Sequence, residues 1–298
     1  MHKIIDIKNL DQIAIIGVGL LGGSIGLALR AAGFGGCRIG AGRRASSLRK
    51  ALNCDAVDVV TRDVAKAVSG SQLVILCTPI RQFDGLITRM APALSPGTYV
   101  TDVASTKAQV VRMAERLLPD PVRFVGSHPM AGSEKTGVEF ARADLFQLST
   151  CILTPTSRTK PATVSWMRRF WEALGCRTVV TSPERHDRLL ARVSHLPHAV
   201  AAALVNLAVC ESAIDLAGPG FADATRIAGG DATMWTDIFR TNRRAVLQAI
   251  DRLVAELRWF RQKLDDDDAQ AILKWLAAGQ EARNKWISRR YRKKVLPP

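Results

Sequence analysis

The stretch IAIIGVGLLGGSIG, residues 13 to 26, decides the fold of the first part of the chain. Gly17, Gly19 and Gly22 form a GxGxxG motif between a β-branched apolar run and the apolar helical segment SIGLALRAAG. In such a motif the first glycine permits a tight turn, the second lets the backbone approach a pyrophosphate, and the third allows strand and helix to pack closely. The helix N-terminus adds N–H groups and a partial positive charge. The stretch therefore predicts a strand, a turn and a helix that bind a dinucleotide.

Residues 12 to 155 alternate short β-branched runs with helical stretches, a pattern that favours a parallel sheet with crossover helices. A further predicted strand at 176 to 183 would close this first domain. The carboxyl ends of such strands open into loops that can bind a ligand. We therefore expect an α/β fold, with a Rossmann-type, doubly wound and mostly parallel sheet in an NAD(P)-binding domain over residues 1–183. The predicted strands are QIAIIG, CRIGAG, LVILCTP, GTYVTDV, RFVGSH, STCILTP and CRTVVTSP.

Residues 184–298 show long helical patterns and no clear strand. Within them, apolar positions step by four and three in turn, which is a heptad seam formed by Val246, Ile250, Leu253, Leu257, Phe260 and Leu264. One seam can be intramolecular core, but we expect an all-helical domain that binds substrate and forms a homodimer. DDDD at 265 to 268 ends the seam and can cap the last helix.

The chain combines an ordinary composition with a strong positive charge. Its 298 residues are 47% hydrophobic and carry a net charge of +15, part of which comes from SRRYRKK at 288 to 294. This charge suits acidic partners or a small polyanionic substrate, and we expect the basic C-terminal tail to be solvated and frayed. The longest apolar run, at 199 to 210, is shorter than a membrane span, and the start does not resemble a signal peptide. We expect a cytoplasmic protein with no nucleic-acid or membrane partner.

The second predicted strand indicates which dinucleotide binds. An NAD site usually places an acid at its end, where the acid holds the ribose 2′-hydroxyl. Here CRIGAGRRASS carries no acid, and Arg43, Arg44 and Ser46 suit a 2′-phosphate, which a guanidinium binds in a bidentate manner. We expect NADP, with NAD possible. Alternatively, the arginines face solvent beside a cofactor that tolerates the missing acid. The predicted cofactor site also includes Leu20, Leu21, Thr78 and Pro79.

Two further predicted strand ends bring polar groups to the same edge of the sheet. DVASTK at 102 to 107 offers Ser105 and Lys107, and GSHPMAGSE at 126 to 134 offers His128. A serine and a histidine beside a nicotinamide suit alcohol oxidation, in which a base takes the hydroxyl proton as hydride leaves the carbon. A loop histidine can equally be structural. No metal site is expected, because no Cys or His lies at ligand spacing from His128.

Seven motifs follow one another between residues 12 and 264: GVGLLGGSIG, DVASTK, HPMAGSEKTGVE, ILTPT, SPERHD, SHLPH and GFADATRIAGGD. Together they closely resemble the prephenate dehydrogenase family, which includes arogenate and cyclohexadienyl dehydrogenases. The resemblance implies an NAD(P)-dependent oxidoreductase of tyrosine biosynthesis that converts prephenate to 4-hydroxyphenylpyruvate by oxidative decarboxylation. The alternatives are an arogenate dehydrogenase, which forms tyrosine directly, and a broad cyclohexadienyl dehydrogenase.

The same resemblance implies the catalytic roles. His128 accepts a hydrogen bond from the ring 4-hydroxyl and takes its proton while C4 gives hydride to the nicotinamide. Ser105 positions the nicotinamide and the substrate hydroxyl. Arg226 binds the ring carboxylate, a role that suits a bidentate guanidinium.

The resemblance also implies residues around the substrate. His198 is a substrate-pocket residue at the start of an apolar helix, where Pro197 suits the first helical position; the alternative is a buried histidine at a helix start. Ser133 and Glu134 are expected at the mouth of the pocket. Independently of the resemblance, His195 is expected to belong to a structural connection, because Ser194 precedes it and Leu-Pro follows it.

One departure from the family pattern concerns the substrate. Ala222 stands where many relatives place a basic residue, so the way in which the substrate side-chain carboxylate is held stays open, and arogenate is favoured as a hypothesis. The segment after the seam is too short for a regulatory domain, so we expect a monofunctional enzyme. A β-hydroxyacid dehydrogenase would not need HPMAG or SHLPH, and a nucleic-acid-binding protein would need a basic stripe interleaved with aromatic residues, which the sequence lacks.

Overall fold

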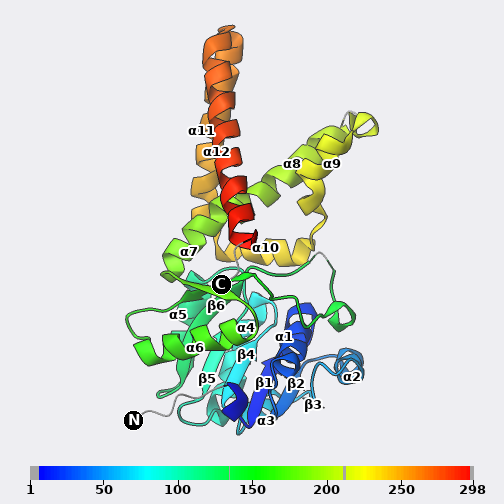
Figure 1. The fold of residues 1–298 in the computed structure, drawn as a ribbon, viewed down its shortest axis with the longest axis vertical. Helices are drawn as coiled ribbons and strands as arrows, with labels where there is room; N and C mark the ends of the chain where they lie inside the picture. The colour runs from blue at the N-terminus through cyan, green and yellow to red at the C-terminus, as the bar shows by residue number, and fades with distance from the viewer. Residues whose placement is uncertain (1–6, 134, 211–212, 296–298) are drawn as a thin grey trace. The chain divides into compact units, whose positions relative to one another are not determined.

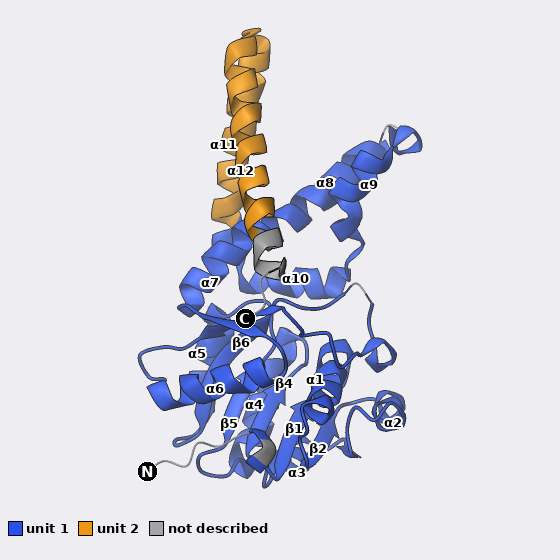
Figure 2. Ribbon diagram, in the orientation of Figure 1, with its two compact units in different colours: residues 1–246 blue, residues 247–298 orange. Residues whose placement is uncertain are grey.

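The computed structural model of the chain describes residues 7–133, 135–210 and 213–295. The chain divides into two compact units, residues 1–246 and residues 247–298 (Figure 2). The first unit contains a sheet with helices on both of its faces and, after the sheet, a helical region (Figure 1).

The first unit is built around an eight-stranded sheet whose strands are β1 (Gln12–Ile16), β2 (Cys37–Ala41), β3 (Val59–Thr61), β4 (Leu73–Leu76), β5 (Tyr99–Asp102), β6 (Arg123–Pro129), β7 (Thr150–Thr154) and β8 (Arg177–Val180). Their order is β3-β2-β1-β4-β5-β6-β7-β8. Only the β6–β7 pair is antiparallel among the pairs described. The predicted doubly wound, mostly parallel sheet is confirmed, although the short edge strand β3 is not among the predicted strands.

The helices that cover the sheet in the described part of the chain include α1 (Leu20–Ala31), α2 (Ala45–Asn53), α3 (Val64–Val68), α4 (Phe83–Met90), α5 (Ala108–Leu117) and α6 (Pro161–Ala173). Successive side chains of a strand point to opposite faces of the sheet, and helices bury both faces. Ile13 and Ile15 of β1 pack in a core cluster with side chains of α1 and α6, whereas Ala14 and Ile16 pack with side chains of α3, α4 and α5. The chain winds away from β1 in both directions, so the carboxyl ends of β1 and β4 form a switch point at which sheets of this kind bind ligands.

The helical region begins with a helix that is continuous from Pro183 to Cys210. α7 (Pro183–Leu190) leads into the π-helical turn η5 (Ala191–His195) and then into α8 (Leu196–Cys210). The prediction that Pro197 starts a new helix is therefore wrong. Proline removes one helical hydrogen bond and crowds the carbonyl four residues earlier, and a widened π-helical turn just before it relieves this conflict without ending the helix.

This helix is also longer than the apolar run at 199–210 suggested. It has 28 residues, and by length and composition alone it could cross a membrane, with a mean hydropathy of 1.5 over an 18-residue window. Only 17% of that window is buried, and Leu204, Leu207 and Val209 are exposed. An exposed apolar surface of this extent marks an interaction site. The rest of the helical region includes α9 (Pro219–Thr225) and α10 (Ala232–Thr241).

The second unit contains most of α11 (Arg243–Asp265) and all of α12 (Ala269–Val295). α11 carries the predicted heptad seam, and Phe260 of this seam stacks on Trp275 of α12 with ring centroids 5.0 Å apart. Leu257 and Leu264 of the seam remain about half exposed. Asp268 accepts a hydrogen bond from the backbone N–H of Ala271 at 3.0 Å, so the predicted acidic cap of the last helix is confirmed.

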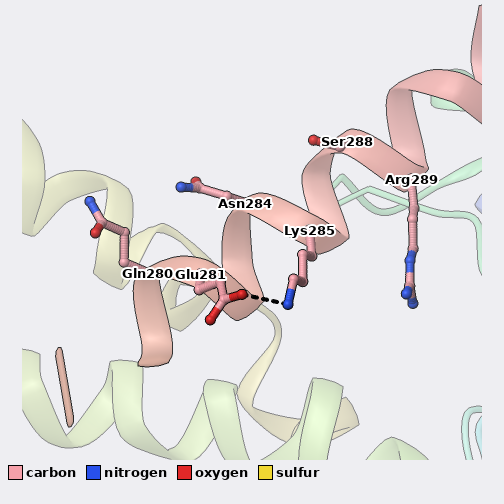
Figure 3. Close-up of a pocket in the computed structure, with 6 residues that line it drawn as sticks. All are labelled: Gln280, Glu281, Asn284, Lys285, Ser288 and Arg289. Atoms are coloured by element: carbon pink, nitrogen blue, oxygen red, sulfur yellow. Dashed lines mark ion pairs between the residues drawn. The ribbon is translucent and has the colours of Figure 1, made fainter. Parts of the chain in front are cut away.

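The basic end of the chain is helical to Val295, so the prediction of a frayed tail is wrong for these residues. Figure 3 shows a polar surface of α12 lined by Gln280, Glu281, Asn284, Lys285, Ser288 and Arg289. Lys285 and Glu281 form an ion pair of 2.5 Å one helical turn apart. All six side chains come from one helix, so this surface is a solvated helix face with an i,i+4 pair.

Candidate active site

The GxGxxG turn joins the end of β1 to the start of α1, and its three glycines have different roles. Gly17 has a φ of 102°, which favours glycine, and a Cβ there would lie 2.7 Å from the carbonyl oxygen of Cys77. A Cβ on Gly22 would lie 2.1 Å from the carbonyl oxygen of Gly17. By contrast, a Cβ on Gly19 would meet no heavy atom within 4 Å. The fold itself requires the first and third glycines, whereas the second leaves space beside the backbone.

The residues around this space fit a dinucleotide. Gly19 is the N-cap of α1 and supplies no side-chain cap, so the first-turn N–H groups are available to a phosphate. Thr78 follows β4 beside Gly17, and its buried Oγ1 has no hydrogen-bond partner within the described ranges. A buried hydroxyl of this kind fits a polar ligand atom. Other predicted residues nearby are the half-buried Leu20 and Leu21 and Pro79, which precedes the 3-10 turn η2 (Ile80–Gln82).

Arg43, Arg44 and Ser46 are all exposed at the start of α2, directly after β2. Arg44 is the N-cap of α2 and makes no side-chain cap hydrogen bond. Neither guanidinium forms an ion pair with any residue that the structure describes. Two free cations at an uncapped helix N-terminus form a site that suits an anion.

His128 lies in β6, where it pairs with the antiparallel β7, and only 8% of its surface is exposed. Its Nδ1 lies 2.8 Å from Nε2 of His186 in α7. Nδ1 of His186 lies 2.8 Å from Oδ1 of Asp187, whose carboxylate accepts hydrogen bonds from the backbone N–H groups of Lys107 and Ala108. A row of buried polar side chains thus connects His128 to the N-terminus of α5.

The loop that carries Ser105 is anchored next to His128. Lys107, at the end of this loop, is fully buried, pairs with the buried Asp102 and donates a hydrogen bond of 2.7 Å to the carbonyl oxygen of Ser127. Burial lowers the pKa of Lys107, and Asp102 opposes this effect. Ser105 itself is half-buried between β5 and α5. Hydrogen bonds from Lys107 to the carbonyl oxygen of Ser127 and from the backbone N–H of Ser127 to Asp102 link the ends of β5 and β6, so Ser105 and His128 belong to adjoining strand ends, as predicted.

Two histidines of the helical region lie beyond His128. Asn242 donates hydrogen bonds to the carbonyl oxygen of Asp187 at 2.8 Å and to Nδ1 of His195 at 3.0 Å. His198 stacks on Trp235 with ring centroids 3.6 Å apart. Nε2 of His195 and Nδ1 of His198 are buried and have no hydrogen-bond partner in the described parts of the chain. These unpaired ring nitrogens fit polar atoms of a ligand.

Arg226 begins the 3-10 turn η7 (Arg226–Gly229), which packs against α8. A Cβ on Gly230 would lie 2.5 Å from Nε1 of Trp235 and 3.3 Å from Cε1 of His198, so this turn passes close to the stacked pair. The Arg226 side chain is exposed. The turn that Arg226 begins therefore leads into a residue that lies beside His198.

The predicted pocket mouth follows β6. Ser133 is exposed, and its Oγ accepts a hydrogen bond of 3.2 Å from the backbone N–H of Lys135. Glu134 lies outside the residues that the structure describes.

Burial keeps the imidazoles of this site neutral. Burial lowers the pKa of His128 well below its ordinary value of 6.5, and the neighbouring His186, Lys107 and His195 lower this pKa further. Burial also lowers the pKa of His186, against the effect of its hydrogen bond to Asp187, and lowers the pKa of His195 to about 4. A neutral imidazole has a lone pair and can act as a base at neutral pH. Within the described residues no group of three or more His, Cys, Asp or Glu side chains could hold a metal ion.

Comparison with known proteins identifies the family. Residues 25–180 match the family described as prephenate dehydrogenase, nucleotide-binding domain, and residues 182–278 match prephenate dehydrogenase, dimerization domain. A cyclohexadienyl dehydrogenase of Zymomonas mobilis is 33% identical over 91% of this chain and 94% of its own length. The chain belongs to the prephenate dehydrogenase family.

Solved structures of prephenate dehydrogenase relatives have the same fold over almost the whole chain. Prephenate dehydrogenase from A. aeolicus, in complex with hydroxyphenyl propionate and NAD+, superposes with a TM-score of 0.83 at 33% identity and covers 92% of this chain and 98% of its own. Synechocystis arogenate dehydrogenase superposes with a TM-score of 0.81 at 30% identity, covering 92% and 99%. The predicted oxidoreductase with a nicotinamide cofactor is thereby confirmed, while the choice between NAD and NADP stays open.

Membership of the prephenate dehydrogenase family also accounts for the exposed apolar helix. α8 falls within the region matched by the dimerization domain, so the apolar side chains of α8 are suited to a second copy of the chain. The prediction of a homodimer through the helical region is confirmed.

Four residues of the site have no predicted role: His186, Asp187, Trp235 and Asn242. The first two lie in SPERHD, a motif that carries the resemblance to prephenate dehydrogenases, and adjacent His and Asp residues on a helix were an available signal. Asn242 and Trp235 belong to no local pattern. Their contacts come from the packing of α10 and the following residue against α7, η5 and α8.

Proposed function

We propose that the chain catalyses the oxidative decarboxylation of prephenate to 4-hydroxyphenylpyruvate. The observation that carries this proposal is the buried, neutral imidazole of His128 at the carboxyl end of β6, in a member of the prephenate dehydrogenase family. A base at this edge of the sheet suits a substrate hydroxyl that loses a proton while the neighbouring carbon loses hydride.

In the proposed reaction, His128 accepts the proton of the ring 4-hydroxyl, and Ser105 orients that hydroxyl. When bound, the nicotinamide would supply the acceptor for the hydride that leaves C4. The bond between the ring and its carboxylate then breaks, carbon dioxide leaves, and the electron pair completes the aromatic ring. His128 returns the proton to the 4-oxygen, so that atoms and charges balance. The gain of aromaticity favours the step, and the protein supplies a base, orientation and counter-charge.

The substrate carries two carboxylates, and we assign cations and polar groups to them. Arg226 binds the ring carboxylate, because an exposed guanidinium on the turn beside His198 can bind it in a bidentate manner. His198 offers its unpaired Nδ1 to the substrate from its stack on Trp235. Ser133 and Glu134 are assigned to the pocket mouth.

We assign NADP as the preferred cofactor. Arg43 and Arg44 stand without ion-pair partners in the described structure at the uncapped start of α2, with Ser46 in its first turn. This arrangement supports binding of a 2′-phosphate, which carries charge that the ribose hydroxyl of NAD lacks. The glycine turn and Thr78 would hold the pyrophosphate and nearby groups of either dinucleotide.

Arogenate is the alternative substrate. Ala222 is exposed on α9 and cannot pair with a side-chain carboxylate, which favours arogenate because its side chain is zwitterionic. Comparable turnover of the two substrates would contradict this preference and would define a broad cyclohexadienyl dehydrogenase.

We assign residues 1–183 to the nucleotide-binding domain and residues 184–298 to the helical substrate and dimerisation domain. A cytoplasmic location is proposed as well. It is supported by the match of α8 to a dimerization domain, in which a second subunit rather than lipid covers the apolar side chains.

The test is a set of initial rates with prephenate and with arogenate, each with NAD and with NADP, followed by absorbance of the reduced cofactor. We expect reduction with at least one substrate and a higher kcat/KM with NADP than with NAD. No reduction in any of the four combinations would overturn the proposed function.

A further inference from the structure

The donor and the acceptor can be assigned for each hydrogen bond that connects Asp187, His186 and His128, starting from Asp187. Oδ1 of Asp187 accepts a hydrogen bond of 2.8 Å from the backbone N–H of Lys107, and its Oδ2 accepts one of 2.9 Å from the backbone N–H of Ala108. These donors form the N-terminus of α5, which stabilises a negative charge. The ionised carboxylate only accepts hydrogen bonds, so the 2.8 Å contact between Asp187 Oδ1 and His186 Nδ1 is donated by the imidazole.

The hydrogen bond to Asp187 also fixes which nitrogen of His186 carries the proton. Burial lowers the pKa of His186, so the ring is neutral at pH 7 and carries one proton, which Asp187 holds on Nδ1. Nε2 of His186 then has a lone pair. Only His128 can donate in the 2.8 Å contact between His186 Nε2 and His128 Nδ1. The single proton of neutral His128 therefore lies on Nδ1, and its Nε2 carries the lone pair.

We propose that His186 and Asp187 are positioning residues that hold the proton of His128 on Nδ1 and thereby keep Nε2 as the basic atom. The proposal rests on the proposed function, in which His128 is the base. Neither positioning residue touches the substrate in this account.

The position of the proton decides whether His128 can act. A neutral imidazole with its proton on Nε2 would present a donor to the substrate hydroxyl and could not take its proton. In a serine protease triad, loss of the correct tautomer lowers kcat about 10⁴-fold. The same hydrogen bonds also stabilise the imidazolium that forms during turnover, because Asp187 supplies a negative charge through His186. Lys107 and His195 are the other charged or titratable groups that act on His128.

The first test is a spectrum of the wild-type protein labelled with ¹⁵N-histidine. Long-range ¹H–¹⁵N correlations distinguish a ring nitrogen that carries hydrogen from one that does not, and the His128→Asn variant assigns the signals of His128. We expect hydrogen on Nδ1 of His128 at neutral pH. Hydrogen on Nε2 would overturn the proposal. This spectrum needs no variant of His186, and it decides the tautomer even if the protein turns over neither prephenate nor arogenate, an outcome that would overturn the proposed function alone.

The second test compares His186→Leu with His186→Gln. Leucine removes the acceptor for His128 Nδ1–H, whereas the glutamine side-chain oxygen can replace it. We expect His186→Leu to lower kcat at least about 100-fold, with KM changed less than about threefold, because a misplaced proton removes general-base catalysis. His186→Gln should recover at least a tenth of the wild-type kcat. Wild-type kcat in a folded His186→Leu protein, or equal loss in both variants, would contradict the proposal.

Discussion

We expect substitution with alanine to affect the free energy of unfolding differently at Gly19 and at Gly22. In Gly22→Ala the new Cβ would lie 2.1 Å from the carbonyl oxygen of Gly17, a backbone atom of the turn that cannot rotate away. Overpacking of this kind costs about 1–3 kcal/mol or more, and 3 kcal/mol corresponds to roughly 6–12 °C in Tm for a domain of about 150–250 residues. In Gly19→Ala the new Cβ would meet no heavy atom within 4 Å, so we expect the free energy of unfolding to change by less than about 0.5 kcal/mol.

The same methyl group on Gly19 would occupy the space through which a pyrophosphate approaches the start of α1. We expect the Kd of the cofactor to rise at least tenfold, or about 1.4 kcal/mol. Thermal unfolding without cofactor measures the change in stability of the Gly22→Ala and Gly19→Ala variants. Fluorescence or calorimetric titration with NADP and NAD measures the change in Kd of the cofactor. Gly85→Ala is the matched control, because a Cβ there also meets nothing within 4 Å but lies on α4, away from the turn. Wild-type cofactor affinity in Gly19→Ala would refute the placement of the dinucleotide.

Three further predictions concern charge. Replacing Arg43 and Arg44 together with alanine should raise KM for NADP at least tenfold and KM for NAD less than threefold, and an equal effect on both would contradict the 2′-phosphate assignment. Arg226→Ala should raise KM for prephenate at least tenfold in steady-state assays, and an unchanged KM would remove it from the substrate site. The pKa of His195 falls from 6.5 unfolded to about 4 folded. The unfolded chain therefore binds more protons in this interval, so stability is complete above pH 6.5 and falls by up to about 3 kcal/mol as the pH approaches 4. Urea unfolding at several pH values measures this loss, which His195→Gln should reduce.

Local patterns account for what the sequence predicted well. The glycine turn, the buried strands and the polar strand ends each depend on consecutive residues, so their spacing alone places Gly17, Ser105 and His128 at one edge of a sheet. The three-residue β3 escaped prediction because it is too short for a periodic pattern. The prediction for Pro197 failed because a neighbouring π-helical turn compensates for the proline, and nothing in the local sequence marks such a turn.

The partners of His128 depend on contacts between distant segments. His186 is 58 residues away along the chain, and it reaches His128 only because α7 packs against α5. Asp187 becomes a cap for α5 by the same packing, about 80 residues from its donors. Residue types in SPERHD show that such a role is possible, but the distances and the direction of the hydrogen bonds come from tertiary structure.

We propose that His128 is the base of the oxidative decarboxylation. The most direct test of this proposal is to measure kcat and, separately, the Kd for prephenate in the wild type and in His128→Asn, a variant that keeps a polar side chain of similar reach but has no basic nitrogen. We expect a Kd within about threefold of wild type and a kcat lower by about 10²–10⁴-fold. A kcat close to that of the wild type would contradict the proposal.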